Sequence, residues 1–254
     1  SLISSIRVLK KLIRAIFSFA GTRSKFYFRA KSKKMIDPTY LSKFLDNAIA
    51  EDIGEGDHTS LACIPETQTG KARIMAKQAG VIAGVAVADF AFRYFDPKLK
   101  VETHITDGSL VKNGDVISGC ELSLLQMERL VLNIMQRMSG IATQTYQYAQ
   151  RIAHTKAKVL DTRKTTPGLR LLEKEAVMLG GGANHRMGLY DMVMLKDNHI
   201  DFAGGIPEAV RRVQHYLQES GKQLKIEVEA RNFDEVGQIL SLQGIHRIML
   251  DNFS

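Results

Sequence analysis

Residues 224–251 read LKIEVEARNFDEVGQILSLQGIHRIMLD, which is an apolar strand, a helix-like stretch and a second apolar strand. The same alternation extends back along the chain, and such alternation predicts a parallel sheet covered by helices. The expected strands are 157–161, 191–195, 224–229 and 246–251, and the expected helices between them are 168–179, 206–220 and 232–242. Each strand ends in charged or amide residues, which is typical of an α/β barrel with its active site at the carboxyl ends of the strands. Because four strands do not close a barrel, we expect an incomplete α/β barrel over residues 151–254.

The preceding region has a different pattern and predicts a separate domain. Ser123 and Gln126 form a capping box that opens a long apolar-periodic helix, which runs to about His154. Residues 35–150 are therefore expected to form an N-terminal α/β domain with a long linking helix. Its other expected elements are helices over 39–50 and 84–95, and strands over 71–78, 99–105 and near 110–120.

The basic residues are concentrated in a leader, residues 1–34, which holds ten Lys and Arg residues and no acidic residue. The rest of the chain has 25 basic and 27 acidic residues, so the net charge of +8 does not indicate nucleic-acid binding by the fold. The leader is readable as sequence upstream of a native start at Met35, as an organellar targeting segment or membrane-surface helix, or as a nucleic-acid arm. We favour the first interpretation, and we expect the leader to lie outside the fold and the protein to be cytoplasmic.

Composition excludes several classes of protein. Apolar residues make up 44% of the chain and charged residues 24%, which excludes a wholly disordered chain. No apolar run reaches the roughly 18–20 residues that a membrane-spanning helix needs. Cys63 and Cys120 are too few and too far apart for a zinc site or a disulfide framework, and we expect both to be buried.

The ends of the expected strands carry five potential cations and two carboxylates. They are Arg163, Lys164, His185, Arg186 and Lys196, with Glu229 and Asp251. Any one of these cations alone is more simply a solvated surface charge, but their shared place at strand ends predicts a pocket for a strongly anionic substrate. The two carboxylates could hold Mg²⁺ together with substrate phosphate oxygens, or could equally accept hydrogen bonds from sugar hydroxyls.

Three consecutive glycines, residues 180–182, precede Asn184, His185 and Arg186. They predict a flexible loop whose backbone N–H groups could approach an anion. Their spacing matches neither a P-loop nor a dinucleotide-binding fingerprint, so this loop alone assigns no function.

Several motifs, in order and at family spacing, resemble the quinolinate phosphoribosyltransferase family. They are EDIGEGDHT (51–59), ER (128–129), SGIAT (139–143), DTRKTTPG (161–168), GGGANHRMGL (180–189), KDNH (196–199), EVE (227–229) and DNF (251–253). The resemblance implies an N-terminal α/β sandwich followed by an α/β barrel, assembled as a homodimer or a higher oligomer. It also implies that quinolinate and phosphoribosyl pyrophosphate give nicotinate mononucleotide, pyrophosphate and CO₂ with Mg²⁺, in NAD biosynthesis.

The resemblance assigns roles by motif match. The implied substrate-binding residues are Arg129, Thr162, Arg163, Lys164, His185, Arg186, Lys196, Glu229 and Asp251. Of these, Lys164, Glu229 and Asp251 are the implied catalytic residues. Glu229 and Asp251 would hold the ribose hydroxyls and Mg²⁺, and Arg129 would reach the site of the partner subunit.

The sequence ends at Ser254, whereas members of the family continue past the DNF motif with further phosphate-binding loops. We therefore expect a form of the enzyme truncated at its C-terminus. Two alternatives stay open: a paralogous phosphoribosyltransferase of the same fold that acts on another substrate, and an inactive fragment.

Overall fold

The computed structural model describes residues 36–65, 70–121 and 125–253. The predictions for the leader and for Ser123 of the capping box lie outside these residues. Within them, no helix combines the length and the apolar character needed to cross a membrane.

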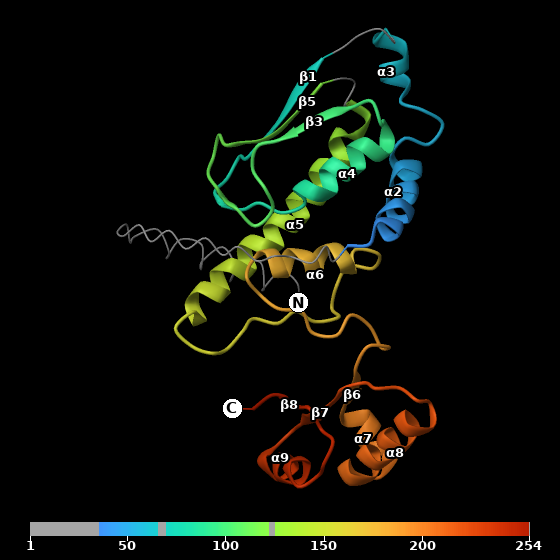
Figure 1. Ribbon diagram of the computed structural model, residues 1–254, viewed down its shortest axis with the longest axis vertical. Helices are drawn as coiled ribbons and strands as arrows, with labels where there is room; N and C mark the ends of the chain where they lie inside the picture. Colours follow the sequence, from blue (N-terminus) through green and yellow to red (C-terminus); the bar gives the residue numbers. More distant parts are fainter. Residues whose placement is uncertain (1–35, 66–69, 122–124, 254) are drawn as a thin grey trace, which may run out of the picture. The chain divides into compact units, whose positions relative to one another are not determined.

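The N-terminal domain combines helices with two small antiparallel sheets (Figure 1). Its helices are α2 (Pro38–Asp52), α3 (His58–Cys63), α4 (Val85–Phe95) and α5 (Leu125–Ile152). Its strands are β1 (Lys71–Met75), β2 (Gly80–Val81), β3 (Lys100–Thr103), β4 (Leu110–Val111) and β5 (Val116–Glu121). The strands pair in the order β1-β5-β3 and as the pair β2-β4. A helix over 39–50 and a helix over 84–95 were expected, and both are present with ends shifted by one or two residues.

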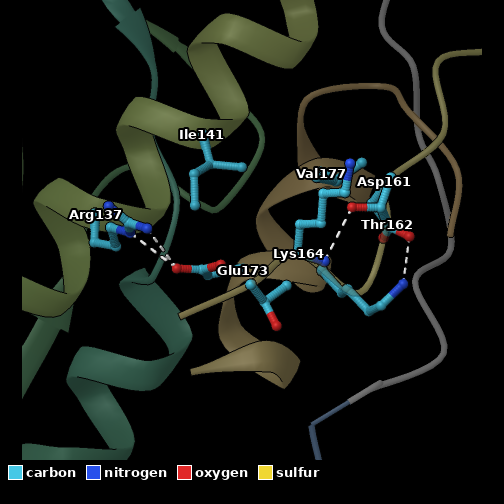
Figure 2. A pocket seen from close by; sticks show the side chains of 9 residues that line it. Arg137, Ile141, Asp161, Thr162, Lys164, Glu173 and Val177 are labelled. Atoms are coloured by element: carbon cyan, nitrogen blue, oxygen red, sulfur yellow. Dashed lines mark hydrogen bonds and ion pairs between the residues drawn. The ribbon is translucent and has the colours of Figure 1, made fainter. Parts of the chain in front are cut away.

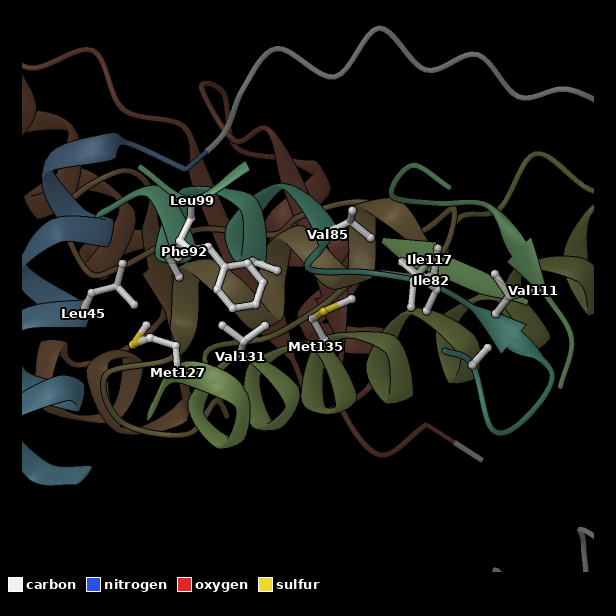
Figure 3. Close-up of a cluster of buried hydrophobic side chains, with 13 residues drawn as sticks. Leu45, Ile82, Val85, Phe92, Leu99, Val111, Ile117, Met127, Val131 and Met135 are labelled. Carbon is white, nitrogen blue, oxygen red and sulfur yellow. The ribbon is translucent and has the colours of Figure 1, made fainter. Parts of the chain in front are cut away.

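Buried apolar side chains from α4 and α5 form the centre of this domain. Phe92 on α4 packs in one core cluster with Val131 and Met135 on α5, and Figure 3 shows these side chains meeting. A second cluster contains Met138 and Ala142 of α5 and side chains from the next helix, α6 (Arg170–Leu179). Helix α5 therefore belongs to both cores and links the N-terminal domain to the region that carries the predicted site.

The C-terminal region contains a parallel three-stranded sheet. Its further elements are β6 (Val193–Leu195), α7 (Asp197–Ala203), α8 (Ile206–Glu219), β7 (Ile226–Ala230), α9 (Phe233–Leu240) and β8 (Arg247–Leu250). The strand order is β6-β7-β8, with each strand parallel to its neighbour. This is the arrangement that the alternation of strands and helices predicted.

The two faces of this sheet differ in chemistry. Ile226, Val228 and Ala230 of β7 are buried in one cluster with apolar side chains of α7, α8 and α9, which lie on one side of the strands in Figure 1. Because successive side chains of a strand point to opposite faces, Glu227 and Glu229 belong to the other face. The sheet thus buries its apolar face under helices and presents carboxylates on the face where a barrel would have its interior.

The expected strand over 157–161 is wrong, because this segment makes only one parallel bridge, Leu160 with Ala183. Backbone bonds join Ala183 N–H to the Val159 carbonyl and Asp161 N–H to the Ala183 carbonyl. The next donor, His185 N–H, bonds to the side chain of Asp161 instead of to the main chain (2.9 Å). A side-chain acceptor thus ends the ladder after one pair.

Two further expectations fail in detail. Cys63 is exposed at the end of α3, contrary to the prediction that it is buried, and the side chain of Cys120 lies outside the described part of the chain. Helices α3 and α7 were not predicted. Each is short, with six and seven residues, so neither repeats an apolar pattern long enough to be read from sequence.

The three-glycine segment packs against helix α5 and is not an open anion loop. The N–H groups of Gly180, Gly181 and Gly182 donate to the carbonyls of Ala176, Met178 and Val177, each at 3.0 Å. A Cβ on Gly180 would overlap the Ala142 carbonyl oxygen of α5 and would lie 2.7 Å from Thr145 Cβ. Close packing therefore explains Gly180 and Gly182, and a positive φ of 87° explains Gly181. The N–H groups of all three are already used.

Replacing Gly180 by Ala should consequently destabilise the protein. Since the added methyl group would meet backbone atoms of α5, we expect the free energy of unfolding to fall by about 1–3 kcal/mol. Gly237→Ala is the matched control, because Gly237 lies within α9 with open space around it, and the exchange there should leave stability unchanged or raise it by about 1 kcal/mol. Urea unfolding measures both changes. Equal stabilities for the Gly180→Ala variant and the parent would contradict the packing role.

Candidate active site

The two segments that carry the first four cations run side by side. The bridge between Leu160 and Ala183 aligns residues 159–161 with 182–184, so Arg163 and Lys164 follow one segment while His185 and Arg186 follow the other. We call Arg163, Lys164, His185, Arg186 and Lys196 the cation cluster. Sequence separations of more than twenty residues are closed here by one short backbone pairing.

Arg186 is a buried cation next to another cation. The residue is 7% exposed, and its hydrogen bond to a protein acceptor is a long one to the Met192 carbonyl (3.4 Å). Burial lowers the pKa of Arg186, and the positive charge of Arg163 lowers it further, against the opposing effect of nearby carboxylates. Among the described residues, the buried Nε of Arg163 has no hydrogen-bond partner. Two guanidinium groups therefore act on each other by charge, and one of them has a buried donor without a partner, an arrangement that an anion would stabilise.

Lys196 joins this group from the end of strand β6. Its ammonium lies 3.6 Å from a carboxylate oxygen of Glu229, which is on β7, and the two side chains are 45% and 15% exposed. Glu229 is also one of the carboxylates whose charge acts on Arg186. The carboxyl ends of β6 and β7 thus bring Lys196 and Glu229 to the two arginines.

The imidazole ring of His185 contacts a buried carboxylate. Its Nε2 lies 2.9 Å from Glu227 Oε2, and the two side chains are 7% and 3% exposed. Arg247 of β8 approaches the same carboxylate oxygen at 3.8 Å. Glu227 therefore fixes the orientation of the imidazole ring, a role that the sequence did not indicate.

A cavity of about 260 Å³ adjoins the segment 161–165 (Figure 2). Its walls come from α5, α6 and that segment, and the lining residues are Arg137, Ile141, Asp161, Thr162, Lys164, Thr165, Glu173, Lys174 and Val177. Arg137 forks onto Glu173 (2.7 and 3.0 Å), and Lys174 pairs with Asp161, so these charges are balanced. Lys164 is the lining cation that has no ion pair among the described residues. The cavity thus suits an anionic group at Lys164.

Arg129 is not brought to the other predicted site residues, whereas Asp251 follows β8 close to Glu229, because its N–H donates to the Ala230 carbonyl oxygen (3.0 Å). Arg129 is exposed on α5, eight residues before Arg137 and hence about 12 Å from it along the helix axis. Asp251 is exposed just after β8, with the Asn252 amide 3.3 Å from its carboxylate. Thr162 lines the cavity with Lys164, and its hydroxyl accepts the Lys164 N–H (3.0 Å).

Glu229 and Asp251 offer two carboxylate ligands for a metal ion, so further ligands would have to come from substrate or water. The described residues contain no group of three or more His, Cys, Asp or Glu side chains that could hold a metal. Glu229 pairs in register with Met249, and Asp251 lies two residues further along, so both carboxylates belong to the same side of the sheet. Two carboxylate ligands suit Mg²⁺ when substrate phosphates and water supply the remaining oxygens.

Sequence reasoning missed the residues that hold the cation cluster in place. Asp161, Lys174, Glu173 and Glu227 are acidic or basic side chains in buried surroundings, and Arg137 bonds to one of them. The sequence offered one signal: Glu173 and Lys174 stand beside the apolar face of an expected helix. Charged side chains at such a place are buried only when they are paired, so this run indicated partners elsewhere. Their partners are far away in sequence, so a pattern in one segment could not identify them.

Comparisons with known proteins identify the family of this chain. Family models of quinolinate phosphoribosyl transferase match in two parts, the N-terminal domain over residues 57–139 and the C-terminal domain over residues 141–254. The chloroplastic nicotinate-nucleotide pyrophosphorylase [carboxylating] of Arabidopsis thaliana is 48% identical over 225 residues, which cover 85% of this chain and 64% of the relative. The chain therefore spans slightly less than two thirds of the length of that plant protein.

Bacterial relatives match over a larger share of their length. A probable nicotinate-nucleotide pyrophosphorylase [carboxylating] of Bacillus subtilis is 43% identical over 215 residues, covering 84% of this chain and 73% of the relative. The crystal structure of NadC from Streptococcus pyogenes superimposes with a TM-score of 0.81 at 36% identity, covering 86% of this chain and 77% of that one. These likenesses confirm the expected α/β fold. The chain belongs to the quinolinate phosphoribosyltransferase family.

Proposed function

We propose that this protein transfers the phosphoribosyl group of phosphoribosyl pyrophosphate to quinolinate, with loss of CO₂. The products are nicotinate mononucleotide and pyrophosphate, as a step in NAD biosynthesis. The observation that carries this proposal is the buried Arg186 beside Arg163, whose Nε has no partner among the described residues. A site that holds two adjacent guanidinium groups is costly unless an anion neutralises them.

Quinolinate has two neighbouring carboxylates on a pyridine ring, and the cation cluster matches that charge. Arginine presents a planar fork of N–H donors that binds a carboxylate with two parallel hydrogen bonds. Arg163 and Arg186 would hold one or both carboxylates, and His185, fixed by Glu227, would contact the ligand through its other ring nitrogen. Nicotinate, with one carboxylate, would leave part of the cluster unneutralised.

In the proposed reaction, the pyridine nitrogen forms a bond to the anomeric carbon of the ribose as the bond from that carbon to pyrophosphate breaks. The sugar carries positive charge in the transition state, and the leaving pyrophosphate gains negative charge. Lys164 borders the cavity and would stabilise the leaving group. Glu229 and Asp251 would accept hydrogen bonds from the ribose hydroxyls. Positioning and fixed charge would thus supply most of the rate enhancement.

Loss of CO₂ follows from the charge on the ring. Once alkylated, the nitrogen is positively charged and draws the electron pair of the breaking bond between the ring and the carboxylate. A proton then replaces CO₂ at that carbon. The cations would hold the carboxylate that leaves and the carboxylate that stays in fixed positions, which directs the cleavage to one of them.

Mg²⁺ would be held by Glu229 and Asp251 together with the phosphate oxygens of phosphoribosyl pyrophosphate. Bound there, it would offset the negative charge of the diphosphate. The oxygen donors and the absence of a three-ligand group among the described residues favour an ion that arrives with the substrate.

The active site would be shared within a homodimer or higher oligomer. Arg129 is exposed on α5 and makes no ion pair with the described residues of its own chain, and the family resemblance assigns it to a neighbouring site. A cytoplasmic location stays a prediction. Some plant relatives are named as mitochondrial or chloroplastic proteins.

A complementation experiment tests the shared site. Arg129→Ala and Lys164→Ala chains should each be inactive as homo-oligomers, because each lacks one charged group at every site. Mixed under conditions of subunit exchange, they should regain activity in hybrid dimers, where one of the two sites is intact. Mixing Lys164→Ala with Arg163→Ala chains is the control and should restore nothing, because both residues belong to the same side of the site. No recovery after proven exchange would contradict the sharing of Arg129.

Quinolinate-dependent release of pyrophosphate tests the proposed reaction. The protein at its natural length, supplied with quinolinate, phosphoribosyl pyrophosphate and Mg²⁺, should release pyrophosphate and CO₂ in equal amounts. Omitting quinolinate should abolish both. Release of pyrophosphate at the same rate with nicotinate, and without CO₂, would favour a paralogous phosphoribosyltransferase.

A further inference from the structure

A buried ion pair that the proposed mechanism does not use contacts the cation cluster at His185. The ammonium of Lys174, on α6, pairs with the carboxylate of Asp161, and the two side chains are 0% and 6% exposed. Withdrawing two charges from water costs free energy that their attraction often only offsets, so a buried ion pair is weak evidence for a stabilising role. The other contacts of the pair indicate what it does.

The pair holds the backbone of one residue at both of its polar groups. His185 donates its N–H to Asp161 Oδ1 (2.9 Å), and Lys174 donates from Nζ to the His185 carbonyl oxygen (3.2 Å). In the orientation that satisfies both groups, the Asn184 amide nitrogen donates to Asp161 Oδ2 and to the Lys174 carbonyl oxygen (3.0 Å). With its N–H and C=O both bonded to buried partners, the backbone of His185 has little freedom to rotate.

These contacts of Asp161 and Lys174 join the segment that leads to Arg163 to the segment that leads to Arg186. Asp161 stands two residues before Arg163, and His185 stands directly before Arg186. Arg163 and Arg186 follow the two segments and carry like charges; burial first and the charge of Arg163 second lower the pKa of Arg186. A single backbone bridge between the segments, at Leu160 and Ala183, would resist repulsion between these charges poorly.

We propose that Asp161 and Lys174 are positioning residues, which hold the Arg163 and Arg186 segments at the spacing that a dicarboxylate needs before the substrate arrives. This inference rests on the proposed function for the identity of the ligand. The pair is neutral as a unit, so it sets the spacing of the cations without changing the net charge of the pocket.

The test is the double variant Asp161→Asn/Lys174→Met, which removes both charges and keeps side chains of similar size. The control is Asp89→Asn/Arg93→Met, which removes an acidic and a basic side chain paired on α4 and introduces the same two residues, Asn and Met. In the full chain, the control should match the parent. In the test variant, hydrogen exchange in peptides that cover 183–187 should become at least ten times faster while the thermal melt stays cooperative. The KM for quinolinate should rise at least tenfold with a smaller change in kcat, because carboxylate contacts act in the ground and transition states alike.

The outcomes separate positioning from a merely structural role. A lower kcat with unchanged KM and unchanged exchange would mean only that less protein is folded, and it would overturn the inference. Unchanged exchange and unchanged KM would overturn it as well. If the double variant does not melt cooperatively, the Asn184→Ala variant is used instead, with hydrogen exchange over 183–187 and the KM for quinolinate as the two measurements. This exchange removes one contact of the pair and leaves both charges in place.

The same experiment distinguishes failure of the proposed function. If the parent protein shows no affinity for quinolinate, the proposed function fails. The exchange rate of residues 183–187 in the double variant then still decides whether Asp161 and Lys174 hold the two segments together.

Discussion

Replacing Arg186 by Leu is expected to lower the affinity for quinolinate by more than about 100-fold. Arg186 is buried next to Arg163 and would give a carboxylate two charge-assisted hydrogen bonds. Each such bond contributes roughly 1.5–3 kcal/mol, and about 2.7 kcal/mol corresponds to a factor of 100. Arg186→Lys should recover part of the loss, since it keeps the charge but not the fork.

The same substitution should cost the unliganded protein little stability. The lowered pKa of Arg186 shows that its surroundings disfavour the charged form, through burial first and Arg163 second. A neutral side chain relieves both effects. Calorimetric titration with quinolinate and a thermal melt without ligand give the two quantities. A large fall in melting temperature with little change in affinity would identify Arg186 as a structural residue and contradict its assignment to substrate.

Replacing Lys174 alone by Met is expected to have the largest effect on stability. It leaves the Asp161 carboxylate buried and unpaired, and breaking a buried pair in this way costs about 3–5 kcal/mol. Because the side chain of Asp161 is only 6% exposed, water has little access to its carboxylate and cannot replace the lost ion pair. The melting temperature should fall by about 6–20 °C on the usual relation between stability and melting temperature for a chain of this size.

The companion measurement for this prediction is the double variant with Asp161→Asn. Removing the second charge should restore most of the lost stability, because the isolated charge and not the missing bond causes the loss. Lys43→Met is a control, since Lys43 is an exposed lysine on a helix. Its removal should change the free energy of unfolding by no more than about 0.5 kcal/mol. If the single and double variants are equally unstable, the isolated-charge explanation is wrong.

Sequence periodicity predicted the elements that repeat an apolar pattern over many residues. The long helix α5 and the unit β7-α9-β8 were expected close to where they lie. The segment 157–161 was expected as a strand because it is apolar, but its ladder ends where the Asp161 side chain accepts the next hydrogen bond. Propensity describes the apolar character of a segment and not the competition of one side chain for a backbone donor.

The candidate site shows the same division between local and distant information. The charged residues at the ends of the expected strands could be identified because strand ends of a parallel sheet lie at one edge. The glycines of residues 180–182 were interpreted as a loop, yet the need for a small residue at Gly180 arises from α5, about forty residues earlier in the chain. The pairings of Asp161 with Lys174 and of His185 with Glu227 likewise join different elements, and nothing within either segment specifies the partner.

The central claim is that the cation cluster binds a pyridine dicarboxylate, and calorimetry with two ligands tests it most directly. Quinolinate and nicotinate differ by one carboxylate, so the ratio of their affinities isolates the contribution of the second charge. One charge-assisted contact is worth roughly 1.5–3 kcal/mol, and we therefore expect quinolinate to bind at least about ten times more tightly than nicotinate. The difference should narrow at high salt, where exposed charges such as Lys196 are screened. Equal affinities for the two acids would contradict the assignment of Arg163, His185 and Arg186 to a dicarboxylate substrate.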